Sequence, residues 1–73
     1  MPKYDLVGQD GNAYAIMGYT ANALKREGLG NLVSEMRTKA MSGDYNNLLC
    51  VCVGYVDMAN EKAIERGYEE DYE

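Results

Sequence analysis

The sequence contains no histidine, so the side chain that most often acts as a general base in enzymes is missing. Its two cysteines, Cys50 and Cys52, are neighbours but one, a spacing at which a disulfide rarely closes with comfortable geometry. Two thiols without a second pair or a histidine also fall short of a four-ligand zinc site. We therefore predict no catalysis, no metal and no cofactor, and reduced thiols of the kind found in cytoplasmic proteins.

Long apolar runs are missing as well. The longest, residues 48–53, is far too short to cross a bilayer, which needs about 20 apolar residues in a helix. Residues 1–5 (MPKYD) do not have the apolar region of a signal peptide. We expect no membrane partner and a location in the cytoplasm.

An excess of positive charge is the third absence. The net charge is −5, and residues 68–73 alone contribute −4, with four acids and no base. Residues 1–67 hold the remaining eight acids and all seven bases, so this part is nearly neutral. A basic footprint for nucleic acid is lacking, and direct nucleic-acid binding is not expected. The chain divides into one domain, residues 1–67, and an acidic tail, residues 68–73, which is read as a solvated end or a docking peptide.

Seventy-three residues bury a thin core, and domains below about 70–80 residues gain from a partner subunit. Tryptophan and phenylalanine are absent, but there are seven tyrosines, whose rings carry a polar tip suited to surfaces and interfaces. These two features predict a homo-oligomer.

Residues 10–28 carry the clearest helix signals. Their apolar side chains recur with a helical period, at positions 13, 16, 17, 20 and 24. Asn12 or Asp10 would cap the start, Lys25 and Arg26 would complement the dipole of the last turn, and Gly28 follows the end. The Asp10-Gly11 turn also permits a hairpin in which residues 12–17 form a strand. The alanines at 13, 15, 21 and 23 favour the helix.

Two more helices follow. Asn31 is expected to cap the second, which has an apolar face at positions 32, 33, 36 and 40 and ends at Gly43. Asp44 would cap the third, whose apolar positions 45, 48, 49, 52, 53 and 56 follow a helical pattern and place Cys52 inward. Residues 57–67 can extend this helix as far as Gly67. Residues 51–56 are also β-branched enough to form a strand that pairs with residues 3–8.

Residues 3–8 read as a short extended segment, with Tyr4 and Leu6 on one side and Val7 on the other. The segment can pair with a strand of this chain, pair with another subunit, or lie as a coil across the helices. The predicted fold is mainly α, a small three-helix domain with a short N-terminal extended segment. The alternative is an α+β fold with a small sheet.

Three stretches carry a resemblance: residues 6–18 (LVGQDGNAYAIMG), residues 23–28 (ALKREG) and residues 42–45 (SGDY), followed by two leucines. Together they resemble a group of short, uncharacterised bacterial and bacteriophage proteins with a VG-x-DGN-A-aromatic-A-x-x-G opening and an SGDY middle. The likeness covers roughly residues 4–58 and excludes the acidic tail. It implies a phage or mobile-element setting in the host cytoplasm. Small phage proteins of this size often block a host protein or sequester a signalling nucleotide.

One face of the first helix is the candidate binding site. At 100° per residue, positions 18, 21 and 25 fall within about 40° of Tyr14, away from the core face. A nucleobase could stack on Tyr14 while Lys25 or Arg26 meets a phosphate, and the amides of the preceding turn could also receive an anion. The predicted ligand-binding residues are Gly11, Asn12, Tyr14, Gly18, Lys25 and Arg26. Plain capping and helix packing would explain the same residues without a ligand.

The resulting functional expectation is a non-enzymatic accessory protein that acts against host defence by binding. The preferred form is an oligomer that sequesters an anionic, nucleotide-like small molecule. The alternatives are an inhibitor that covers a host protein with its helical faces or its acidic tail, and a structural protein.

Overall fold

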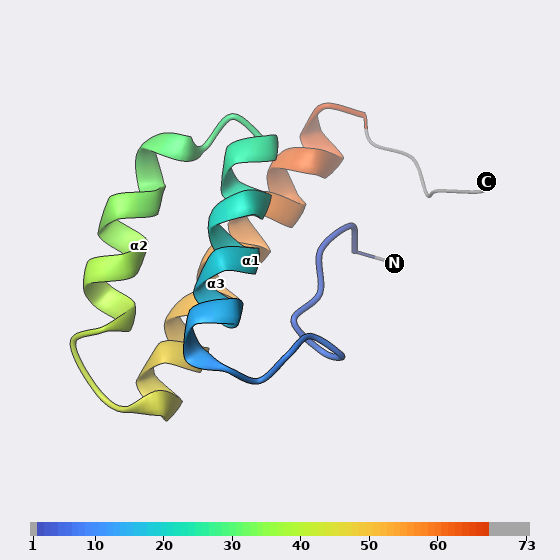
Figure 1. The fold of residues 1–73 in the computed structure, drawn as a ribbon. Helices are drawn as coiled ribbons and strands as arrows, with labels where there is room; N and C mark the ends of the chain where they lie inside the picture. The colour runs from blue at the N-terminus through green and yellow to red at the C-terminus, as the bar shows by residue number, and fades with distance from the viewer. Residues whose placement is uncertain (1, 68–73) are drawn as a thin grey trace.

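The computed structural model describes residues 2–67, which form three helices that run up, down and up. They are α1 (Ala13–Arg26), α2 (Val33–Ala40) and α3 (Tyr45–Glu65), and the short 3-10 helix η1 (Gly30–Leu32) precedes α2. Figure 1 shows α2 on one side of α1 and the N-terminal segment on the other. Residues 2–67 contain no strand, so the mainly α prediction is confirmed and both sheet alternatives are wrong. The acidic tail, residues 68–73, lies outside the described residues.

Both ends of α1 are formed as the sequence predicts. Asn12 is the N-cap, and its side chain accepts hydrogen bonds from the amides of Tyr14, at 2.9 Å, and Ala15, at 3.3 Å. Past the other end Gly28 has a φ of +76°, which glycine adopts without strain. The amide of Leu29 then donates to the carbonyl of Leu24 at 2.8 Å. This 6→1 bond is the mark of a Schellman stop.

The boundaries predicted for the second helix are wrong at both ends. Asn31 does not cap it, because residues 30–32 first form η1 and no side chain caps the start of α2 at Val33. The helix stops at Ala40, before Gly43. Near this end the carbonyl of Lys39 accepts hydrogen bonds from two side chains, Ser42 Oγ at 2.7 Å and Asn47 Nδ2 at 3.0 Å.

Helix α3 spans 21 residues and includes residues 51–56, the stretch rich in β-branched side chains. Asp44 caps it by accepting from the amide of Asn47 at 2.9 Å, and Gly67 follows its end with a φ of +82°. Cys52 is buried as predicted, whereas Tyr45 and Val53 lie at the margins of the apolar face and are 45% and 48% exposed. Burial of one face against α1 and α2 outweighs the local strand preference.

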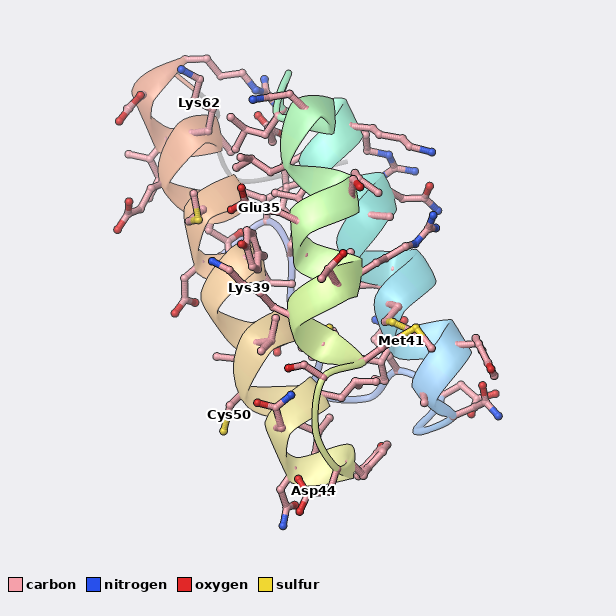
Figure 2. All side chains as sticks on the ribbon, turned by 90° about the vertical axis from the view of Figure 1, so that its left-hand side faces the viewer. Glu35, Lys39, Met41, Asp44, Cys50 and Lys62 are labelled. Atoms are coloured by element: carbon pink, nitrogen blue, oxygen red, sulfur yellow. The ribbon has the colours of Figure 1, made fainter. Side chains whose placement is uncertain are left out.

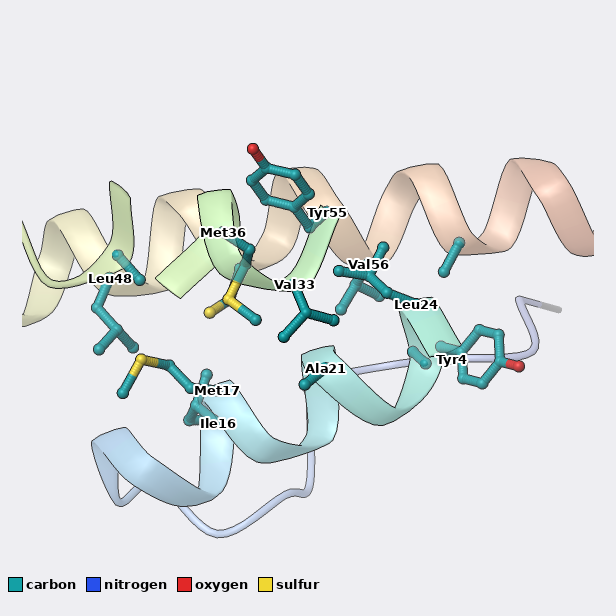
Figure 3. Packing of buried hydrophobic residues seen from close by; sticks show 14 residues of the cluster. Tyr4, Ile16, Met17, Ala21, Leu24, Val33, Met36, Leu48, Tyr55 and Val56 are labelled. Carbon is teal, nitrogen blue, oxygen red and sulfur yellow. The ribbon is translucent and has the colours of Figure 1, made fainter. Parts of the chain in front are cut away.

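The core lies where the three helices meet (Figure 3). Fourteen buried hydrophobic side chains form one cluster, with Leu24, Met36, Cys52 and Ala59 fully enclosed. Thr20 is also fully buried, and its hydroxyl donates to the carbonyl of Ile16 at 2.9 Å, so its polar atom has a partner. Tyr55, Ala59 and Ala63 complete the inner face of α3, beyond the positions that the apolar pattern had marked.

The N-terminal segment crosses α1 and α3 as a coil, one of the three arrangements that the sequence allowed. Asn60 replaces a partner strand, because its amide group both accepts from the backbone amide of Tyr4, at 2.8 Å, and donates to the carbonyl of Tyr4, at 2.9 Å. The hydroxyl of Tyr19 accepts from the amide of Asp5 at 2.9 Å. Tyr4 points inward and Val7 outward, as the alternation predicted.

Glu27 connects this segment to the ends of two helices. It is the one buried charged side chain among residues 2–67, and it accepts from the hydroxyl of Tyr4 at 2.5 Å and from Arg66 at 2.6 and 3.0 Å. The hydrogen bonds from Arg66 lower the pKa of Glu27 to about 2, against the opposing effect of burial. Burial, together with the bond to Glu27, raises the pKa of Tyr4 to about 12. The carboxylate is therefore ionised and the phenol is protonated at neutral pH.

Glu27→Gln is predicted to lower the free energy of unfolding by about 2 kcal/mol at neutral pH, because charge-assisted hydrogen bonds are lost. Since the folded pKa of Glu27 lies below its ordinary value of 4.5, its contribution is complete above pH 4.5 and disappears as the pH falls towards 2. Urea unfolding of the wild type and the variant should therefore converge at acid pH. Glu61→Gln, at an exposed position of α3, is the control. A constant difference across this range would contradict the assignment.

Candidate functional site

A groove of about 260 Å³ opens at the end of the bundle where α1 and α3 begin and α2 ends. We call it the end groove. Its walls come from two helix starts, one helix end and the connecting loop. They comprise Ala13, Tyr14, Met17, Ala40, Met41, Gly43, Asp44, Tyr45 and Leu48.

Large apolar side chains are exposed at the end groove. Tyr14 is 73% exposed, Met41 60% and Tyr45 45%, while Leu48 beneath them is buried. Figure 2 shows Met41 beside the start of α1 and Asp44 at the tip of α3. Tyrosine and methionine are both enriched at protein interfaces. The end groove is thus an apolar recess between side chains of the kind that bind partners.

The turn before α1 holds two of the predicted site residues, and both are engaged within the chain. The carbonyl of Gly11 accepts a hydrogen bond from the hydroxyl of Tyr45. The side chain of Asn12 covers the amides of Tyr14 and Ala15. The amides that would have received an anion therefore already have an acceptor.

The other predicted site residues are spread along α1. Tyr14 lines the end groove, and a methyl group built on Gly18 would meet open space. Lys25 follows Tyr14 by eleven residues, which is about 16 Å along a helix axis. Arg26, one residue further, points about 100° away from Lys25 around that axis. The structure therefore brings none of these cations to the ring of Tyr14.

Ala21 interrupts the surface between these residues. The helical period places it on the same side as Tyr14 and Lys25, but it is only 2% exposed. Small residues on a helix often allow close packing, and the buried side chain of Ala21 packs in the core. Tyr14 and Lys25 consequently do not border one continuous open groove.

Eight of the nine residues that line the end groove had not been proposed as a site from the sequence, and Met41, Asp44 and Tyr45 are the exposed large or charged ones among them. Asp44 and Tyr45 belong to the SGDY stretch, which carried the resemblance but was interpreted as a helix boundary, whereas Met41 precedes that stretch. A single helix cannot show the groove, because its walls combine the start of α1, at residues 13–17, with residues 40–48, which lie more than 20 residues further along the chain. Glu27 was missed for the same reason, although an acid at a helix C-terminus opposes the dipole and so requires a compensating partner.

Charges near the end groove are mainly negative. Asp44 lines it, and Asp10 lies in the adjoining turn, where its side chain accepts from the amide of Asn12 at 3.0 Å. Lys25, Arg26 and Arg37 form no ion pair within residues 2–67. Arg37 is exposed and lies one helical turn before Met41, which lines the end groove.

A second polar cluster lies between α2 and α3, and its side chains contact one another. The hydroxyl of Tyr55 donates to Glu35 at 2.5 Å, and this bond raises the pKa of Tyr55. The ammonium of Lys39 lies 5.8 Å from the ring centroid of Tyr55 and 3.8 Å from the carboxylate of Glu35. These contacts attach α2 to α3.

The two cysteine thiols differ in their surroundings. Burial raises the pKa of the Cys52 thiol, which disfavours the reactive thiolate, and Cys50 is exposed on the outer side of α3. No three potential metal-ligating side chains gather anywhere in residues 2–67. Within the same range no helix has the length and apolar character to span a bilayer.

Comparisons of this chain with protein-family models, curated proteins and solved structures find no match. The phage or mobile-element setting therefore rests on the three resembling stretches alone and stays a prediction.

Tyr45→Phe is predicted to lower the free energy of unfolding by about 1 kcal/mol, the usual net contribution of one hydrogen bond, because the carbonyl of Gly11 loses its donor. Tyr14→Phe is the matched control, since the hydroxyl of Tyr14 has no partner among residues 2–67. Urea unfolding of both variants measures the difference. Equal stability of the two variants would show that the tyrosine contact does not hold the turn.

Proposed function

We propose that this chain is a non-catalytic binding protein that attaches to another protein through the end groove. The carrying observation is the exposure of Tyr14 and Met41 over a recess with apolar walls. Rigid aromatic side chains beside a pocket are the usual energetic centre of a protein interface. An apolar side chain of the partner would enter the recess, and the tyrosine hydroxyls would meet polar groups at the rim.

Three features favour a protein partner over an anionic small molecule at this groove. Its volume of about 260 Å³ lies below the usual range for small-molecule sites, about 300–1,000 Å³. The carboxylate of Asp44 would repel an anion. The nearby helix amides already have Asn12 as their acceptor.

The biological setting that we propose is a phage or mobile-element accessory protein that blocks host defence in the cytoplasm. The support for it is the resemblance of the opening and SGDY stretches to short phage and bacterial proteins. SGDY contributes Gly43, Asp44 and Tyr45 to the end groove, so the resembling residues and the proposed surface coincide.

A second candidate function is capture of a nucleotide-like anion along the α1–α2 side of the bundle. The specific observation is that Lys25 and Arg37 are exposed and form no ion pair within the described residues. Tyr14 could stack on the base while Arg37, one helical turn before Met41 of the end groove, meets a phosphate. A homo-oligomer would enclose such a shallow surface, in accordance with the thin core.

The first function predicts a particular pattern of peptide binding. Peptides selected from a random display library on the wild type should carry a large apolar side chain, and the variant Tyr14→Ala with Met41→Asp should weaken their binding at least about tenfold. Ile64→Asp, which changes an equally exposed apolar residue outside the end groove, should bind as the wild type does. Selected peptides that bind all three proteins equally would overturn the assignment of the groove.

The second function predicts stabilisation by nucleotides. In a thermal-shift panel of cyclic and linear nucleotides, a ligand at 100 times its Kd stabilises the folded state by about 2.7 kcal/mol. Arg37→Ala should abolish the rise in melting temperature that the nucleotide causes. Arg66 is not a suitable control position, because its side chain donates a hydrogen bond to Glu27 and supports the fold. Light scattering of the same samples reports the assembly state. No shift with any nucleotide, or an unchanged shift in Arg37→Ala, would exclude this candidate.

A further inference from the structure

A separate cavity of about 300 Å³ lies between the N-terminal segment and α3. We call it the N-terminal cavity. Its lining includes four aliphatic side chains and two carboxylates: Leu6, Val7, Val53, Val56, Asp5 and Asp57. None of them belongs to the end groove.

One wall of the N-terminal cavity is aliphatic and open to solvent. Val7 is 85% exposed and Val53 is 48% exposed, although both are purely apolar. Val56 is buried beneath them, and Leu6 is half-buried. The cavity therefore offers a methyl-lined surface that a flexible aliphatic chain could cover.

The other feature of this cavity is its pair of acids. The side chain of Asp57 has neither a hydrogen-bond partner nor an ion-pair partner among residues 2–67. Asp5 uses one carboxylate oxygen to accept from the amide of Val7 at 2.9 Å. Its other oxygen has no partner in that same part of the chain.

No base of this chain among residues 2–67 lines the N-terminal cavity. Lys3 is the nearest base in the sequence, and its ammonium lies over the ring of Tyr4, 5.8 Å from the centroid. The cavity thus combines an aliphatic wall with two negative charges and has no internal cation of its own.

We propose that the N-terminal cavity binds a lysine side chain of a partner protein. The four methylenes of the lysine lie on Val7 and Val53, and its ammonium meets the carboxylates of Asp5 and Asp57. Lysine commonly places its aliphatic stem on apolar surface and keeps its charge at the rim. Complementary charge at an interface of this kind sets orientation and partner choice. This site goes beyond the end groove and does not depend on it.

The test is an NMR titration of the ¹⁵N-labelled full chain with N-acetyl-lysine methylamide. N-acetyl-norleucine methylamide has the same aliphatic stem without the charge and serves as the neutral probe. The amide signals of Val7, Val53 and Asp57 should shift with lysine, at a concentration about fivefold lower than with norleucine, as expected for one partly exposed ion pair of about 1 kcal/mol.

Asp57→Asn should remove the preference for lysine while its spectrum confirms that the fold is intact. Asp44→Asn, in the end groove, is the matched control and should keep the preference. Equal responses to the two probes, no response to either, or a preference that survives in Asp57→Asn would overturn the proposal. Shifts of the same amides on simple dilution of the protein would also overturn it, because a second copy of the chain would then occupy the cavity.

Discussion

The buried carboxylate of Glu27 is the contact on which the arrangement of this small protein depends. A charge removed from water is costly unless charged and polar groups surround it, and Glu27 has Arg66 from the end of α3 and Tyr4 from the N-terminal segment. Three segments that are distant in sequence thus meet at one side chain. The contact places the end of α1 beside the end of α3 and holds the N-terminal segment against both.

Hydrogen bonds of tyrosine hydroxyls connect segments that are distant in sequence and so supplement the small apolar core. Tyr4 donates to Glu27, Tyr45 to the carbonyl of Gly11 and Tyr55 to Glu35, while Tyr19 accepts from the amide of Asp5. The rings of Tyr4, Tyr19 and Tyr55 pack in or against the apolar core, and each of the four hydroxyls connects to a different segment. A chain of this length without phenylalanine or tryptophan therefore combines apolar burial and specific attachment in the same residues.

These attachments create two recesses with the same chemical character. The end groove and the N-terminal cavity both have apolar walls and acidic rims, with Asp44 in one and Asp5 and Asp57 in the other. A tyrosine hydroxyl anchors one lining residue of each: Tyr45 of the end groove donates to the carbonyl of Gly11, and the amide of Asp5 in the N-terminal cavity donates to Tyr19. A surface of this kind is suited to a partner with basic and apolar side chains, which supports protein binding as the principal proposed activity.

The sequence alone determined those helix boundaries that have strong local capping or stop signals. Asn12, Asp44, Gly28 and Gly67 mark boundaries through their own side chain or backbone, so these ends were predictable. The start and end of α2 were not, because η1 and the side chains of Ser42 and Asn47 replace local capping. Of the residues predicted to bind a ligand, Tyr14 alone lines the end groove, because the groove joins residues from three elements and the sequence of one helix does not show which elements will pack beside it. Tertiary structure decided the burial of Glu27, the position of the N-terminal segment and both recesses, because each arises from contacts between segments that only folding brings together.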